Sequence, residues 1–139
     1  MLTLAQAKII VAKGLEKGRE MNLDPLCIAV LDAGGHLKAL EREDGAGNMR
    51  VQIATGKAWG AIGMGFSSRQ IGQRLGDRPA FLNALTTMAE GKVVPVPGGV
   101  LILCEGRVIG GVGVSGAASD DDEACAVAGI EAAGLQAQC

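Results

Sequence analysis

The chain has 139 residues, a formal net charge of −2 and 48% hydrophobic residues, which fits a single domain over residues 1–139. It has no run of basic residues and only 2% aromatic residues, so we expect no nucleic-acid partner. No stretch approaches the length of a membrane span and no signal-peptide core follows the N-terminus, so we expect a cytoplasmic protein with no membrane partner.

The first third of the chain predicts a helix followed by a β-hairpin. Thr3 and Gln6 have the spacing of a capping box, and apolar residues at helical spacing then predict a helix to about Met21. The apolar run 26–31 predicts a buried strand, and a glycine turn leads into a second strand over 36–42.

The middle of the chain predicts helices. A helix is expected to begin near Asn48, and Gly56 and Gly60, four residues apart, indicate close packing against another element. The serines at 67–68 are expected to cap a short helix. Pro79 is expected in the first turn of a further helix.

The last third predicts strands and a closing helix. Segment 92–97 holds two prolines, so we expect it to be extended at an edge or rim of the sheet. Run 100–104 predicts a buried strand, and a tight turn leads into a glycine-rich strand over 107–116. Ser119 is expected to cap a helix whose first turn carries the acids 120–123. Two hairpins separated by helices predict an antiparallel sheet flanked by helices, in an α+β or three-layer arrangement.

One glycine motif resembles a nucleotide-binding sequence. Gly111, Gly113 and Gly116 form a G-x-G-x-x-G pattern after a strand and before a helix. Only one helix follows, and its acidic first turn would repel a pyrophosphate. We therefore expect these glycines to allow close backbone packing.

The four cysteines are widely spaced and none lies in a C-x-x-C motif, which argues against a zinc site. Cys27 and Cys104 lie in predicted strands and Cys125 lies in a predicted helix. We expect all three to be buried, unreactive thiols.

Short motifs spread over the chain carry a family resemblance. They are Ile28–Leu37, Arg42–Ala46, Ala54–Ala58, Pro97–Val100, Gly110–Gly116 and Asp122–Gly129. In this order they resemble the GlcG/HbpS family, which also forms the C-terminal part of some cobalamin adenosyltransferases. Leu101 stands where the family pattern has a proline, and Gly60 where it has a hydroxyl residue.

The resemblance implies a five-stranded antiparallel sheet with helices on both faces, and a homo-oligomer from dimer to octamer. It also implies a small ligand, haem or another tetrapyrrole, and some members of the family degrade haem. Other members are encoded in catabolic operons. Because a porphyrin face prefers broad apolar walls, the scarcity of aromatic residues opposes the haem interpretation.

His36 is the only histidine and therefore the first candidate for an axial haem ligand or a general base. It follows a Gly-Gly turn, where a solvated histidine is the alternative. If haem is bound, Cys104, Met49 and the hydroxyl of Ser115 remain open as other ligands.

The candidate anion-binding residues are Arg42 and Lys57. They could receive the propionates of a tetrapyrrole or the carboxylate of a small acid, although each could also be a solvated surface charge. Gly98 and Gly99 could add backbone donors at the same rim.

An alternative function is an enzyme that acts on a small carboxylated or oxygenated metabolite. Asp44, Glu123 or His36 would transfer protons, and Arg42 or Lys57 would hold the substrate. Acids at the start of the closing helix can also simply stabilise it, and Asp120 with Glu123 could bind a metal weakly, so we assign no dedicated metal ligands. A structural subunit without chemistry is a third possibility.

Overall fold

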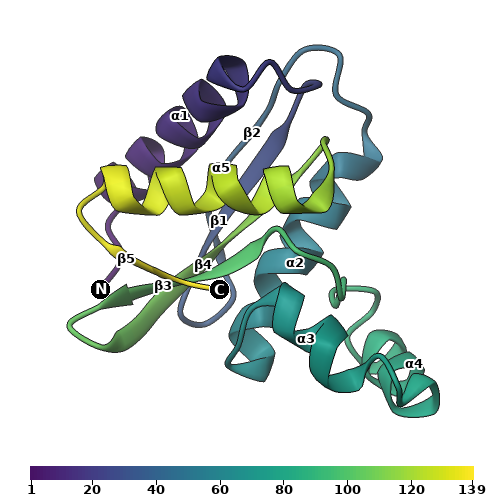
Figure 1. The fold of residues 1–139 in the computed structure, drawn as a ribbon. Coiled ribbons are helices and arrows are strands. Elements are labelled where there is room, and N and C mark those ends of the chain that lie inside the picture. The colour runs from purple at the N-terminus through teal and green to yellow at the C-terminus, as the bar shows by residue number, and fades with distance from the viewer.

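The computed structural model describes residues 1–139 and contains a five-stranded antiparallel sheet with helices on both faces (Figure 1). The elements are α1 (Leu4–Glu20), β1 (Cys27–Asp32), β2 (Leu37–Arg42), α2 (Met49–Met64), α3 (Ser68–Leu75), α4 (Pro79–Met88), β3 (Gly99–Cys104), β4 (Arg107–Ser115), α5 (Ser119–Ala132) and β5 (Gln136–Gln138). The strand order is β2-β1-β4-β3-β5, and every neighbouring pair is antiparallel. The expected α+β class and the five strands are confirmed.

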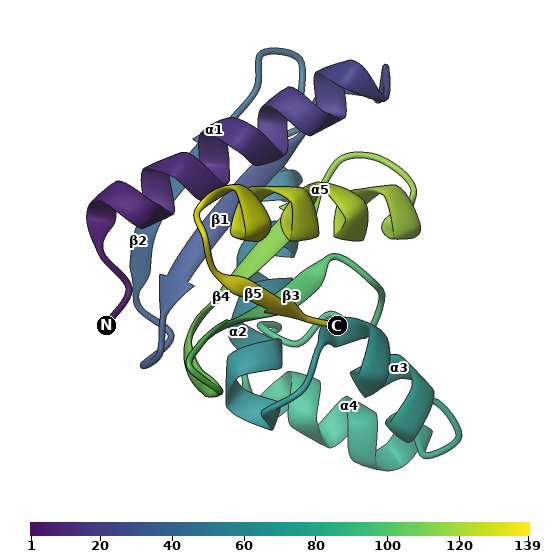
Figure 2. The same ribbon diagram turned by 60° about the vertical axis from the view of Figure 1, so that its left-hand side comes forward.

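The helices form two unequal layers. α1 and α5 cover one face of the sheet, and α2 covers the other, while α3 and α4 project to the side (Figures 1 and 2). Because side chains alternate along a strand, Ile28 and Val30 of β1 join the large core under α1 and α5. Cys27 and Ala29 face α2 instead. None of the helices combines the length and apolar character needed to cross a bilayer.

The G-x-G-x-x-G pattern lies mostly inside β4, where it allows α2 to approach. A Cβ atom on Gly113 would lie 1.7 Å from the carbonyl oxygen of Ala54, and one on Gly111 would lie 3.0 Å from Cγ1 of Ile62. These two glycines are therefore required for helix-to-sheet packing, as expected.

Segment 92–97 forms no strand and lies against α2 before the chain enters β3. A Cβ atom on Gly60 would lie 3.2 Å from both the Lys92 oxygen and the Cα of Val93. The close packing expected from Gly56 and Gly60 is confirmed, and this segment is the partner.

The starts of α1 and α3 carry the caps that the sequence predicts, whereas the start of α5 does not. The N-cap of α5 is Ala118, and Ser119 is already helical, so the expectation that Ser119 caps the helix is wrong. Instead Oδ1 of Asp122 accepts a hydrogen bond from the backbone N–H of Ala117 at 2.9 Å. A carboxylate inside the first turn thus accepts the hydrogen bond of a backbone N–H just before the helix.

Cys27 and Cys125 are buried as expected, but Cys104 is exposed. Cys104 ends β3 and pairs with Arg107 beside the exposed turn into β4. The residue pattern also did not reveal β5, which pairs with Leu101–Leu103.

Candidate functional site

The candidate residues lie at two opposite ends of the sheet. His36 precedes β2, and Arg42 ends this six-residue strand, so their Cα atoms are about 20 Å apart. Arg42 pairs with Cys27, which pairs with Ser115, so these three residues form a row across the sheet. The structure therefore separates the histidine from the anion-binding candidates.

At the first end, the turn between β1 and β2 holds the imidazole of His36. Its Nδ1 lies 3.3 Å from Oδ1 of Asp32. The same oxygen accepts hydrogen bonds from the backbone N–H groups of Gly34 and His36, each at 3.0 Å. The N–H of His36 is the main cause that lowers the pKa of Asp32 below its ordinary value, so this carboxylate is ionised near neutral pH. The His36 side chain is 82% exposed, and its Nε2 forms no hydrogen bond within the chain.

The imidazole borders an open cavity of about 440 Å³ between the N-terminus, the β1–β2 turn and the start of β4. The cavity is lined by Met1, Leu2, Asp32, Ala33, Gly34, His36, Arg107, Val108 and Ile109. Most of the walls are aliphatic, and Arg107 forms no ion pair. The cavity thus combines a histidine, an apolar surface and an unpaired cation.

At the second end, Lys57 is buried and paired. Its Nζ lies 3.2 Å from Oδ2 of Asp122 and donates to the carbonyl oxygen of Val114 at 2.9 Å. The side chains of Lys57 and Asp122 are 3% and 2% exposed. Burial lowers the pKa of Lys57 and raises that of Asp122, while their mutual attraction opposes both shifts.

Gly98 and Gly99 cover this buried lysine. A Cβ atom on Gly98, whose φ is +128°, would lie 2.7 Å from Nζ of Lys57. The N–H of Gly99 already donates to Oγ of Ser68 at 2.7 Å. Arg42 donates to the carbonyl oxygen of Ala46. A ligand would have to displace existing partners of Lys57 and Gly99, so their roles in anion binding stay predictions.

Asp44 lies on an exposed loop beside a cavity of about 480 Å³. Besides Asp44, the cavity is lined by Leu15, Arg19, Pro25, Glu41, Arg42 and Glu43. Nε of Arg19 lies 3.2 Å from Oε2 of Glu43, so two of the charged residues that line the cavity form an ion pair with each other. Asp44 and Arg42 share this surface, and Met49, an alternative iron ligand, is exposed at the start of α2.

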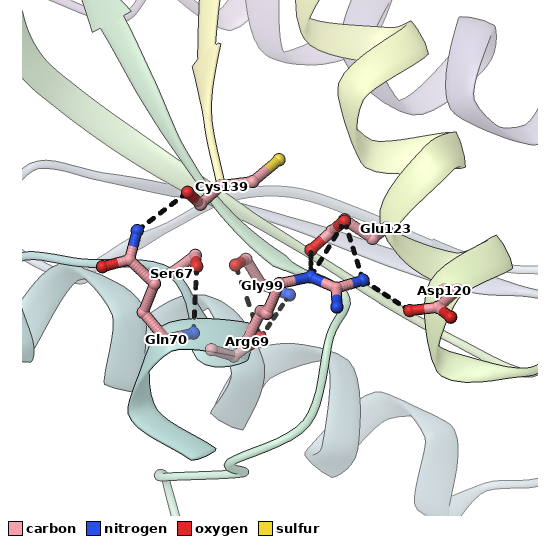
Figure 3. Close-up of polar contacts among 8 residues, drawn as sticks. Ser67, Arg69, Gln70, Gly99, Asp120, Glu123 and Cys139 are labelled. Carbon is pink, nitrogen blue, oxygen red and sulfur yellow. Dashed lines mark hydrogen bonds and ion pairs between the residues drawn. The ribbon is translucent and has the colours of Figure 1, made fainter. Parts of the chain in front are cut away.

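Glu123 is committed to an ion pair between two helices. Nε of Arg69, on α3, lies 3.0 Å from Oε2 of Glu123, and Nη2 of Arg69 binds Asp120 (Figure 3). These carboxylates raise the pKa of Arg69, chiefly through the hydrogen bond that its guanidinium donates to Glu123. The two acids that could have held a metal thus bind a guanidinium. Nearby, Nε2 of Gln70 donates to the backbone oxygen of Cys139 at 2.9 Å (Figure 3).

Comparison with known proteins places the chain in a family. Residues 2–131 match the family model described as haem degrading protein HbpS-like. The chain belongs to the HbpS-like family. GlcG of Escherichia coli K12 is 35% identical over 117 residues, which cover 83% of this chain and 81% of GlcG.

Solved structures of relatives agree with the HbpS-like fold. The crystal structure of a PduOC–haem complex has a TM-score of 0.88 at 24% identity and covers 99% of both chains. A double mutant of Streptomyces reticuli HbpS has a TM-score of 0.80 at 28% identity and covers 94% of this chain and 85% of its own. The fold expected from the GlcG/HbpS resemblance is therefore confirmed.

One charged residue beside Lys57 was not among the residues singled out from the sequence. Nη1 of Arg50, on α2, donates to Oγ of Ser115 at 3.1 Å, and Arg50 forms no ion pair with a carboxylate. Arg50 is half-buried, and its charge acts on both Lys57 and Asp122. The signal was available, because Arg50 and Lys57 are seven residues apart and such residues share a helix face.

Proposed function

We propose that this HbpS-like protein binds haem or another tetrapyrrole in the cavity beside His36. The observation that carries the proposal is the contact of His36 Nδ1 with Asp32, which leaves Nε2 exposed for a metal. Histidines that bind metals commonly direct their second ring nitrogen to a carboxylate, which fixes the ring and strengthens the ligand. Membership of a family described as haem-degrading supports the same ligand.

The rest of the cavity suits an amphipathic ring. Val108 and Ile109 provide aliphatic surface, which compensates in part for the scarcity of aromatic residues. Arg107 can pair with a propionate through its planar guanidinium. Haem bound here would supply an iron centre for redox or oxygen chemistry. Asp32 would hold the imidazole of His36 in place, and Arg107 would orient a propionate of the ligand.

A titration with haemin, followed at the Soret band, tests this proposal. We expect saturable binding that His36→Ala abolishes and that Asp32→Asn weakens by about tenfold or more, as for other partners of metal-binding histidines. Cys104→Ser and Met49→Leu are matched controls at the alternative ligands and should bind as the wild type does. Absence of a saturable shift in the wild type would reject haem binding. Loss of the Soret band with a reductant and oxygen would separately report haem degradation.

A second candidate is an enzyme for a small carboxylated metabolite at the opposite end of the sheet. The observation that favours it is Arg50, a half-buried cation that has no carboxylate partner and donates a hydrogen bond to Ser115. Ser115 lies in the same row across the sheet as Arg42. Asp44, an exposed acid on the loop after β2, would transfer the proton. Chemical-shift titration with malonate tests it: shifts centred on Arg50 that Arg50→Met removes support the site, and their absence rejects it.

We also propose that the protein works as a homo-oligomer, as its family resemblance implies. The exposed apolar side chains of Leu4 and Ile9 on α1 support this because such surface is often buried between subunits. Sedimentation at a single monomer mass over a wide concentration range would contradict it.

A further inference from the structure

A small apolar pocket lies between α2, α4 and the segment that follows α4. Its volume is about 200 Å³, and its lining includes Trp59, Gly63, Met64, Leu85, Met88 and Val93. None of the lining side chains is charged. The pocket shares no lining residue with the cavity beside His36, although the ring of Trp59 lies next to Gly35 in the turn that holds His36.

A cation without a counter-ion lies over the ring of Trp59, one of the residues that line this pocket. Nζ of Lys92 lies 5.0 Å from the centroid of the Trp59 ring. Lys92 forms no ion pair and no side-chain hydrogen bond, although it is half-buried. An ammonium on an aromatic face beside an apolar cavity can attract a ligand that has both an apolar body and a negative charge.

We propose that this pocket binds a small amphipathic monocarboxylate. An aliphatic cavity of about 150 Å³ accepts benzene, so the present volume suits one aromatic ring with a short substituent. The ring would lie between Trp59 and the methionines, whose flexible thioethers adapt to ligand shape. The carboxylate would pair with the ammonium of Lys92 beside the Trp59 ring.

Trp59 provides the readout, because it is the only tryptophan of the chain. Its fluorescence is followed while the protein is titrated with 3-phenylpropionate and, in parallel, with the neutral amide of the same acid. We expect saturable binding of both, with the acid bound about threefold to fivefold more tightly, the range of a partly exposed ion pair. Lys92→Met should remove the difference while the amide binds as before.

A second variant fills the pocket without a clash. A Cβ atom on Gly63 would meet only Cζ3 of Trp59, at 3.9 Å, so Gly63→Leu should fold and occupy the space of the ligand. Ligand-observed NMR, which does not depend on the altered environment of Trp59, should show no binding of either compound. Gly47→Leu is the matched control, because a Cβ atom there meets nothing within 4 Å. The thermal midpoint of each variant confirms that it is folded.

Three results would overturn the proposal: no saturable signal in the wild type, equal affinity for acid and amide, or unchanged binding by Gly63→Leu. A second copy of the chain seated on the pocket would produce the first result together with an oligomer in sedimentation. The titration is made without haem and repeated with His36→Ala, which should bind 3-phenylpropionate normally. Its outcome is thus separate from that of the haem proposal.

Discussion

The ammonium of Lys57 and the carboxylate of Asp122 are 65 residues apart in the chain and 3.2 Å apart in the interior. Their contact joins α2 to the first turn of α5. The second oxygen of Asp122 accepts from the N–H of Ala117, so one carboxylate serves both an ion pair and the entry to the helix. We expect this pair to stabilise the packing of α2 and α5 at the end of the sheet that holds Ser115.

Removal of one partner from this pair should be strongly destabilising. Lys57→Met leaves the charge of Asp122 buried and should lower the free energy of unfolding by about 3 to 5 kcal/mol in a urea titration. Adding Asp122→Asn removes that charge and keeps an acceptor for Ala117, so the double variant should recover part of the loss. Lys13→Met, which breaks an exposed pair with Glu16, should cost less than about 1 kcal/mol. Equal costs for the two lysine variants would contradict the structure.

The packing of α2 on β4 gives a second prediction. Gly113→Ala would place a methyl group 1.7 Å from the oxygen of Ala54, so the helix would have to move away from the sheet. We expect a loss of about 3 kcal/mol or more, or failure to fold. Gly47→Ala, at an open position, should change stability by less than about 0.5 kcal/mol. A folded Gly113→Ala with an unchanged thermal midpoint would show that α2 lies farther from β4.

Acid stability should depend on Asp32. Its pKa in the folded chain lies below the ordinary value of 3.8, chiefly because the N–H of His36 donates to it. The ionised form therefore contributes stability above pH 3.8, and this contribution is lost as the pH falls through the lowered pKa. The difference in unfolding midpoint between the wild type and Asp32→Asn should shrink on acidification below pH 3.8. A difference that does not change with pH would argue against these hydrogen bonds.

The thiols should react according to their exposure. Burial raises the pKa of both Cys27 and Cys125 to about 11, so almost no thiolate is present near neutral pH. Iodoacetamide should alkylate Cys104 in the native protein and reach the two buried thiols only after unfolding. Peptide mapping by mass spectrometry measures this order, and early labelling of Cys27 would contradict the packing under α2.

Local signals in the sequence predicted most of the fold, because caps and apolar periodicity act within one element. The capping box at Thr3 and the proline at the start of α4 both lie where they were expected. The residue pattern did not predict β5, because its three residues, Gln-Ala-Gln, have no apolar pattern and join the sheet by pairing with β3. The burial of Cys104 was wrongly expected because it is the last residue of β3, where an apolar strand runs out into an exposed turn.

The site was less predictable, because its contacts join distant parts of the chain. Nothing in the spacing of Lys57 and Asp122 indicates that they pair, so Lys57 looked like an available cation. The separation of His36 from Arg42, by contrast, follows from the strand between them, which the sequence predicted. Arg50 could have been found from its helical spacing to Lys57, but its contact with Ser115 depends on how α2 lies on the sheet.

Chemical rescue tests the central claim, ligation of haem by His36, most directly. His36→Gly removes the imidazole at a turn that already contains glycines, and added imidazole can then occupy the vacated position. We predict that the haemin Soret spectrum of the wild type is lost in His36→Gly and restored by imidazole. A wild-type spectrum in His36→Gly without imidazole would contradict the account.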